Sequence, residues 1–207
     1  MKKPKPSLQM NAPFTLILVL LSFLIHLINR YTDGAAVRVV FSVYRSHLPD
    51  PLTIVRFFFH VFGNADWQTL YVSMIPILVL GPNLEERYGT GQIFAGSLAT
   101  VLLSGIIHFA AFPNGEIMMG AEGIMYMMYL LATVGGSKDG GIPLTMLLVL
   151  VAYSMMEIQS VGAGAILRID HIVGALCGVL MGMSLRAVPP PPPEKKDDGG
   201  KGEEKKG

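Results

Sequence analysis

Residues 120–134 read Gly-Ala-Glu-Gly-Ile-Met-Tyr-Met-Met-Tyr-Leu-Leu-Ala-Thr-Val, a glutamate followed by a largely apolar run. The run predicts a membrane helix that opens beside Glu122. A second polar motif, Arg168-Ile169-Asp170-His171, opens the last apolar run in the same way. An ionisable residue at the mouth of a transmembrane helix is costly to keep in lipid, so we interpret Glu122 as functional. The alternative is that Glu122 lies among the lipid headgroups.

The composition of the whole chain indicates the same class of protein. Of 207 residues, 51% are hydrophobic and 15% are charged, and the mean hydropathy is +0.49, which is typical of a polytopic membrane protein. The net charge of +1 argues against a nucleic-acid partner. The single cysteine, Cys177, excludes a disulfide framework. No Cys or His spacing indicates a metal, and we predict no cofactor.

Six apolar runs approach the roughly 17–25 residues that a spanning helix needs. They are residues 12–29, 66–82, 91–112, 118–135, 142–159 and 170–187. We therefore predict one all-α domain over 1–187, a bundle of six transmembrane helices whose first span is not a cleaved signal peptide. The aromatic segment 30–65 is expected to lie partly in the membrane interface. The prolines and charges of 188–207 predict a disordered tail.

The distribution of Lys and Arg predicts that both termini are cytoplasmic, in the plasma membrane. With this orientation the inner segments hold eleven of the 16 basic residues and the outer segments hold five. The second, fourth and sixth spans then all begin at the outer face. Thr69, Ser73, Glu122 and His171 would lie at similar shallow depths there, in one polar cluster if those spans adjoin.

Three motifs in this order resemble the rhomboid family of intramembrane serine proteases. Residues 80–89 (Leu-Gly-Pro-Asn-Leu-Glu-Glu-Arg-Tyr-Gly) resemble the turn between its second and third helices. Residues 120–123 are similar to its Gly-x-Ser-Gly nucleophile motif, and His171, followed by Gly174 and Gly178, resembles its general-base helix. The resemblance implies the six-helix fold of that family and a proteolytic site built from the second, fourth and sixth helices.

The catalytic pattern of the family is degenerate in this chain. The resemblance places Glu122 at the nucleophile, Thr69 and Ser73 at the oxyanion donors, and Asn64 at an upstream histidine, whereas His171 keeps the base. A carboxylate cannot replace the attacking hydroxyl, and its negative charge opposes the oxyanion. The chain therefore looks like a rhomboid pseudoprotease. We also predict that Glu122 and His171 approach each other and lock the fourth and sixth helices together.

Three functions remain open at this point. The first is an inactive protein that binds transmembrane segments of clients. The second is an active endopeptidase that uses Ser73, His171 and Glu122 as a rearranged triad. The third is a path for protons or small ions through Glu122 and His171. The expected partners are the lipid bilayer and client transmembrane segments, and an oligomer is compatible with each function.

Several other residues receive structural interpretations. Gly174, Gly178 and Gly182 favour close packing against the fourth helix, with homodimerisation as the alternative. The methionines of the fourth helix are expected to face lipid, with a client surface as the alternative; they are Met118, Met119, Met125, Met127 and Met128. His26 and His108 are predicted to be hydrogen-bonded packing residues. Glu85 and Glu86 are expected to cap the third helix, and Arg45 and Arg56 to contact headgroups.

Overall fold

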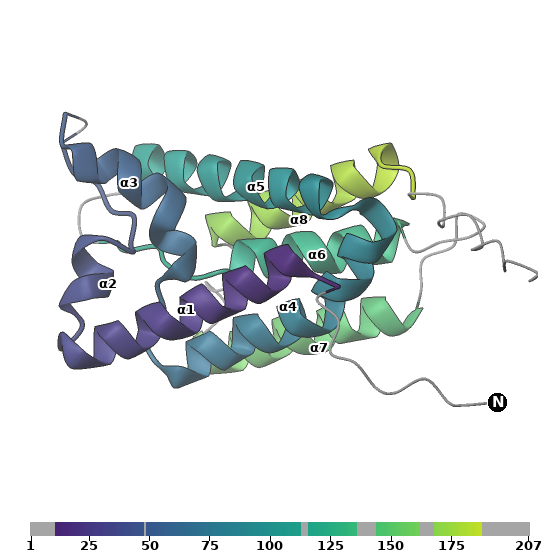
Figure 1. Cartoon of the computed structure of the whole chain (residues 1–207), viewed down its shortest axis with the longest axis horizontal. Helices are drawn as coiled ribbons and strands as arrows, with labels where there is room; N and C mark the ends of the chain where they lie inside the picture. The colour runs from purple at the N-terminus through teal and green to yellow at the C-terminus, as the bar shows by residue number, and fades with distance from the viewer. Residues whose placement is uncertain (1–10, 48, 113–115, 136–143, 162–167, 188–207) are drawn as a thin grey trace, which may run out of the picture.

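The structure is a computed structural model, and it describes residues 11–47, 49–112, 116–135, 144–161 and 168–187. Its helices are α1 (Pro13–Tyr31), α2 (Ala35–Val39), α3 (Pro51–Phe59), the 3₁₀ turn η1 (His60–Phe62), α4 (Trp67–Tyr88), α5 (Thr90–Ala111), α6 (Glu122–Gly135), α7 (Leu144–Val161) and α8 (Ile169–Ser184). Each of the six predicted apolar runs coincides with one of the longer helices (Figure 1). Within the described residues there is no strand, only an isolated bridge between Val43 and Met118. The predicted all-α fold is confirmed.

Helix α6 forms the centre of the bundle and contacts α4, α5, α7 and α8. Residues 121–129 are buried without interruption, as expected for an apolar helix enclosed by protein. Met125, Met127 and Met128 are 0% exposed. The predictions that these methionines face lipid or a client are therefore wrong, because α6 has neighbours on its whole circumference.

Helix α8 packs tightly on α6 through its glycines. A Cβ atom on Gly174 would strike the carbonyl of Gly123, and one on Gly178 would strike the carbonyl of Met127. A Cβ atom on Gly182 would approach the Cβ of Val134 to 2.8 Å. The small residues let the two backbones meet, which confirms the predicted packing. The same contact occupies the glycine face that the homodimer alternative would have used.

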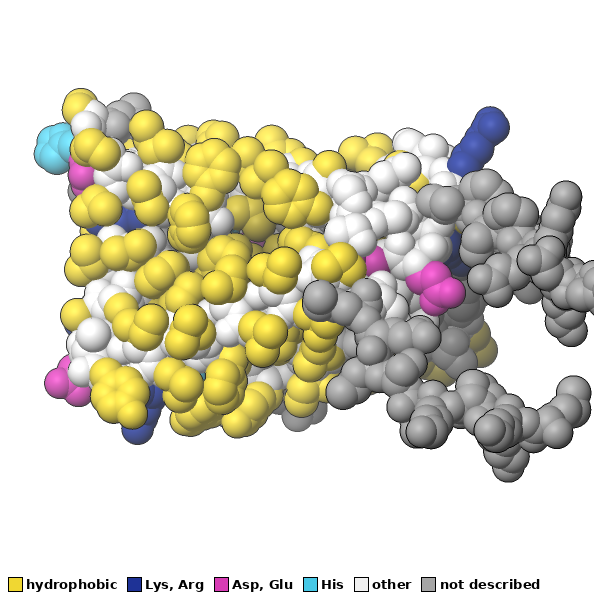
Figure 2. Space-filling view, viewed as in Figure 1, with side chains coloured by type: hydrophobic (Ala, Val, Ile, Leu, Met, Phe, Trp, Pro, Cys, Tyr) yellow, Lys and Arg dark blue, Asp and Glu magenta, His cyan; other side chains and the backbone are white. Residues whose placement is uncertain are grey.

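The flank of the bundle is apolar, and two of its helices reach spanning length. Hydrophobic side chains cover the flank of the bundle seen in Figure 2, whereas charged side chains gather toward its two ends. Within the described residues two helices are long and apolar enough to span a bilayer by length and composition, Pro13–Tyr31 and Thr90–Ala111. Helix α1 begins and α8 ends at the same end of the bundle (Figure 1). This arrangement is compatible with an even number of passes.

Segment 30–65, predicted to lie partly in the membrane interface, folds into α2, α3 and η1 and is braced from within by Arg56. The Arg56 side chain is 5% exposed; its Nε donates to the Val39 carbonyl at 2.8 Å, and a terminal nitrogen lies 3.6 Å from the Asp50 carboxylate. The guanidinium also stacks over the Tyr44 ring, 4.4 Å from its centroid. The prediction that Arg56 contacts headgroups is therefore wrong. Arg45 is exposed.

Glu85 joins three helices at the end of the bundle where α1 and α5 begin. Its carboxylate accepts hydrogen bonds from the backbone N–H groups of Phe14 (3.2 Å) and Thr15 (2.7 Å), and from the hydroxyls of Thr15 (2.6 Å) and Thr90 (2.8 Å). Glu85 thus caps the N-terminus of α1. From α5 it accepts a hydrogen bond from the Thr90 side chain and none from the backbone. The prediction that Glu85 caps the third apolar run, which forms α5, is therefore wrong. We call this arrangement the Glu85 clamp.

Some predictions fall outside the described residues. The tail over 188–207 and the lysines Lys2, Lys3 and Lys5 lie there.

Candidate functional site

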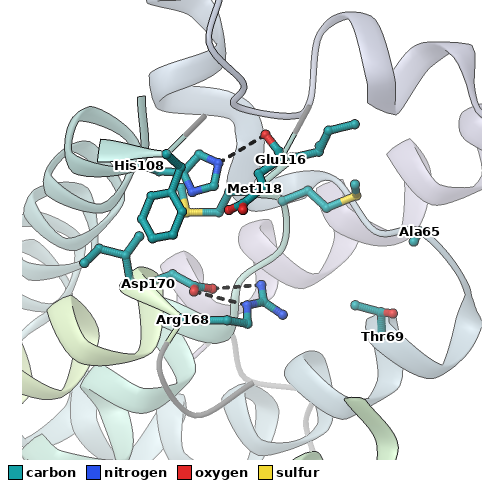
Figure 3. A pocket seen from close by; sticks show the side chains of 11 residues that line it. Ala65, Thr69, His108, Glu116, Met118, Arg168 and Asp170 are labelled. Carbon is teal, nitrogen blue, oxygen red and sulfur yellow. Dashed lines mark hydrogen bonds and ion pairs between the residues drawn. The ribbon is translucent and has the colours of Figure 1, made fainter. Parts of the chain in front are cut away.

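Helices α4, α6 and α8 begin at one end of the bundle, beside the last turn of α5, and we call this the site end. A cavity of about 380 Å³ opens there. Its walls come from α4, α5, α8 and the segments that precede α4, α6 and α8 or follow α5; the lining residues are Ala65, Thr69, His108, Phe112, Glu116, Ile117, Met118, Met119, Arg168, Ile169 and Asp170 (Figure 3). Of the four residues predicted to form one polar cluster, Thr69 lines this cavity, whereas Ser73, Glu122 and His171 are not among its lining residues. The predicted cluster stays a prediction.

Glu122 is inside the protein, at the first position of α6. Gly120 precedes it with φ +105°, a left-handed conformation that favours glycine, and a Cβ on Gly120 would strike the Glu122 carboxylate. The Gly120 N–H donates to the His60 carbonyl at 3.0 Å, which fixes the turn to η1. Glu122 is only 3% exposed. The alternative that it lies among headgroups is therefore wrong.

Arg168, the residue that precedes α8, is a charged neighbour of Glu122. A terminal nitrogen of Arg168 lies 3.8 Å from Glu122 Oε2. The same guanidinium grips Asp170 with two hydrogen bonds, at 3.0 and 3.3 Å (Figure 3). The Arg168 guanidinium thus lies next to two buried carboxylates. The Glu122 side chain is 3% exposed and the Asp170 side chain 5%, whereas the Arg168 side chain is 33% exposed. A buried carboxylate requires such a partner.

His171 lies behind this ion cluster. Its Nε2 is 3.9 Å from Asp170 Oδ2, and its ring stacks on Tyr126 of α6 with centroids 4.5 Å apart. The side chain is 4% exposed. These contacts join α8 to α6 beside the cluster. The predicted Glu122–His171 approach stays a prediction.

The two residues at the predicted oxyanion positions use their hydroxyls locally. Thr69 Oγ1 donates to Asp66 Oδ1 at 2.8 Å, and the Thr69 N–H donates to the same oxygen, so that Asp66 caps α4. Ser73 is 0% exposed, and its Oγ donates to the carbonyls of Thr69 (3.1 Å) and Leu70 (3.3 Å). Among the described residues Ser73 makes no hydrogen bond to His171 or Glu122. Both hydroxyls bond within α4 and its cap, and Thr69 also lines the cavity.

The remaining polar residues near the site have packing roles. Asn64 accepts hydrogen bonds on its backbone carbonyl from His26 Nδ1 (3.4 Å) and Asn29 Nδ2 (3.5 Å). His108 Nε2 donates to the Glu116 carbonyl at 3.4 Å. The predicted hydrogen-bonded roles of His26 and His108 are thus confirmed. Burial lowers the pKa of His60 from 6.5 to about 4, which keeps this ring neutral.

The sequence did not predict the roles of three residues at the site end. Arg168 lies beside Glu122, and His108 and Glu116 line the cavity. Arg168 and Glu122 are far apart in the chain, and only the crossing of α6 and α8 at Gly123 and Gly174 brings them together. The polar motif around Arg168 is visible in the sequence, but it does not indicate which helix the Arg168 side chain contacts.

Comparison with known families decides the assignment. The family model described as the rhomboid domain matches residues 51–188, two-thirds of the chain. The chain belongs to the rhomboid family. No curated protein matches it. This rhomboid protein is therefore an integral membrane protein of rhomboid type, and the match extends over both helices that carry the ion cluster.

Proposed function

We propose that this rhomboid protein is a pseudoprotease that binds transmembrane segments of client membrane proteins without cleaving them. The observation that carries the proposal is the Glu122 carboxylate, buried at the nucleophile position and 3.8 Å from Arg168. A carboxylate in an ion cluster cannot supply the hydroxyl of the family's acyl-enzyme mechanism. Its negative charge also opposes a developing oxyanion.

The helix that should stabilise the oxyanion supports the same proposal. An oxyanion hole needs hydrogen-bond donors that point at the reacting oxygen. Thr69 and Ser73 instead donate to Asp66 and to backbone carbonyls of α4. Because the losses affect coupled positions, restoring one residue would leave the others missing.

A lateral cleft offers a place for a client helix. It has a volume of about 280 Å³ and lies between α6, α7 and α8; its walls are Tyr126, Leu130, Leu150, Ser154, His171, Ile172 and Ala175. Ala175 and Ser154 are small, which permits close approach of a helix, and hydroxyls can hold a polar group of a client. Tyr126 and Ser154 hydroxyls lie 3.4 Å apart at this cleft.

Client capture tests the proposal. A photo-crosslinker at Ile172, which is 39% exposed and lines the cleft, should capture transmembrane proteins in native membranes. The matched control is the same crosslinker at Ile106, 50% exposed on α5. Positions Ser73 and Met125 are unsuitable because both are 0% exposed. Recovery of lipid alone at Ile172, or identical proteins at both positions, would refute client binding.

The finer topology is also part of the proposal. Six helices would span the plasma membrane, with both termini cytoplasmic and segment 30–65 outside, as the eleven-to-five distribution of basic residues supports. A cysteine at position 47 should react with an impermeant reagent from outside, and a cysteine at position 200 only from inside. The reverse pattern of labelling would overturn this orientation.

A further inference from the structure

A groove on the flank of the bundle lies between the first half of α1, the turn η1 and the start of α5, and its volume is about 400 Å³. Thr90 is the polar residue of its lining. The Thr90 hydroxyl donates to Glu85 Oε2 at 2.8 Å, and the Phe14 N–H donates to the same oxygen at 3.2 Å. An occupant therefore meets hydrocarbon walls, because the Glu85 clamp already uses these donors. The apolar lining includes Phe14, Ile17, Leu18, Leu21, Phe62 and Phe94.

The groove faces the bilayer. Its two long walls belong to α1 and α5, the two described helices that are long and apolar enough to span a membrane. Both helices lie on the flank that hydrophobic side chains cover (Figure 1, Figure 2). Among the lining residues, Ile17 is 57%, Phe94 51% and Leu21 38% exposed. Since the chain belongs to a family of integral membrane proteins, these side chains contact lipid hydrocarbon.

The dimensions of the groove select its occupant. Along the groove α1 rises by about 12 Å from Pro13 to Leu21. A helix about 10 Å across would occupy roughly 900 Å³ over that length, which is more than twice the volume of the groove. The rings of Phe14 and Phe94 meet edge to face with centroids 5.7 Å apart, so they join the two walls. The groove thus accommodates a thin apolar chain and is too small to enclose a helix of a client or of a second copy.

We propose that this groove binds one acyl chain of a phospholipid and retains it longer than the surrounding lipid is retained. Transfer of the chain from the bilayer gains no hydrophobic free energy, because lipid tails are as apolar as the walls. The gain comes from van der Waals contacts with walls on several sides. The bound chain fills the space between α1 and α5 beside the Phe14–Phe94 contact and holds α1 on the bundle. This lipid site does not depend on client binding.

The experiment uses the full chain, one copy in each nanodisc of phosphatidylcholine. A fraction of the lipid carries a diazirine near the methyl end of one acyl chain, and mass spectrometry locates the adducts after irradiation. Leu21 in the groove is compared with Leu78 on α4, which lies outside it. Both leucines lie near the middle of their helices, and they are 38% and 42% exposed. Bulk lipid would label them equally, whereas a retained chain should label Leu21 about fivefold more, which corresponds to about 1 kcal/mol.

Two variants locate the effect. Ile17→Trp puts a larger side chain into the groove and should reduce the labelling of Leu21 to that of Leu78. Leu20→Trp is the matched control on the same helix, because Leu20 is 66% exposed and does not line the groove. This control should keep the excess at Leu21. Equal labelling of Leu21 and Leu78 in the wild type, or an excess that survives Ile17→Trp, overturns the lipid site and leaves the proposed client binding untouched.

Discussion

Two glutamates, each 3% exposed, stand at opposite ends of this bundle and have different surroundings. Glu85 accepts four hydrogen bonds of 2.6–3.2 Å, two on each oxygen, from neutral donors at the starts of α1 and α5. Glu122 lies beside a cavity, 3.8 Å from an arginine that is one-third exposed. Neutral donors satisfy Glu85, whereas a partly exposed cation lies beside Glu122. Burial alone therefore does not distinguish a structural carboxylate from a carboxylate of the site, and the chemical type of the neighbouring groups has to be compared.

The largest effect is expected at the Glu85 clamp. Glu85→Ala leaves four donors without their acceptor, so we expect a loss of about 3–5 kcal/mol in the free energy of unfolding. Unfolding in mild detergent by increasing fractions of denaturing detergent measures this loss. Glu86→Ala, at the exposed neighbour, should change it by less than about 0.5 kcal/mol. Similar losses in Glu85→Ala and Glu86→Ala would show that Glu85 is not a structural carboxylate.

A smaller effect is expected at Glu122. In Glu122→Ala the Arg168 guanidinium keeps its two hydrogen bonds to Asp170 and is partly solvated. We therefore expect a loss of about 1–2 kcal/mol, below the range for breaking a fully buried pair. The same unfolding experiment decides it. A loss as large as that of Glu85→Ala would mean that Glu122 is a second clamp rather than part of a site.

No gain of proteolysis is expected from Glu122→Ser alone. The serine would lack oxyanion donors, because Thr69 and Ser73 donate to Asp66 and to the α4 backbone. Each absent donor is worth about 2.7–4 kcal/mol of transition-state stabilisation. The kcat/KM for a transmembrane substrate should stay at background in Glu122→Ser. Substantial cleavage by this single variant would show that the oxyanion stabilisation persists in another form.

The sequence predicted the helices well because apolar runs of spanning length are hard to mistake. All six runs match helices, and the glycines of α8 indicated its packing on α6. Hydropathy could not tell which apolar side chains face lipid and which face protein. Met125, Met127 and Met128 were therefore misplaced, because both environments favour the same residue types in a membrane.

The site could be predicted only in part from the sequence. The motif that contains Glu122 and the helix that contains His171 were found, since both depend on local order in the chain. The partners of the charged residues depend on how helices cross, so Arg168 beside Glu122 was not foreseen. Glu85 was expected to serve α5 and instead caps α1, 70 residues away in the chain. Such pairings are set by tertiary packing, which one sequence does not display.

We propose that this rhomboid protein retains the family's scaffold without its protease activity. The most direct measurement combines a serine-directed phosphonate probe with a generic transmembrane substrate, applied to the purified wild-type chain and to Ser73→Ala and His171→Ala. We expect no labelling and no cleavage in any of the three proteins. Labelling or cleavage by the wild type that disappears in Ser73→Ala or His171→Ala would contradict it and establish the rearranged triad of Ser73, His171 and Glu122.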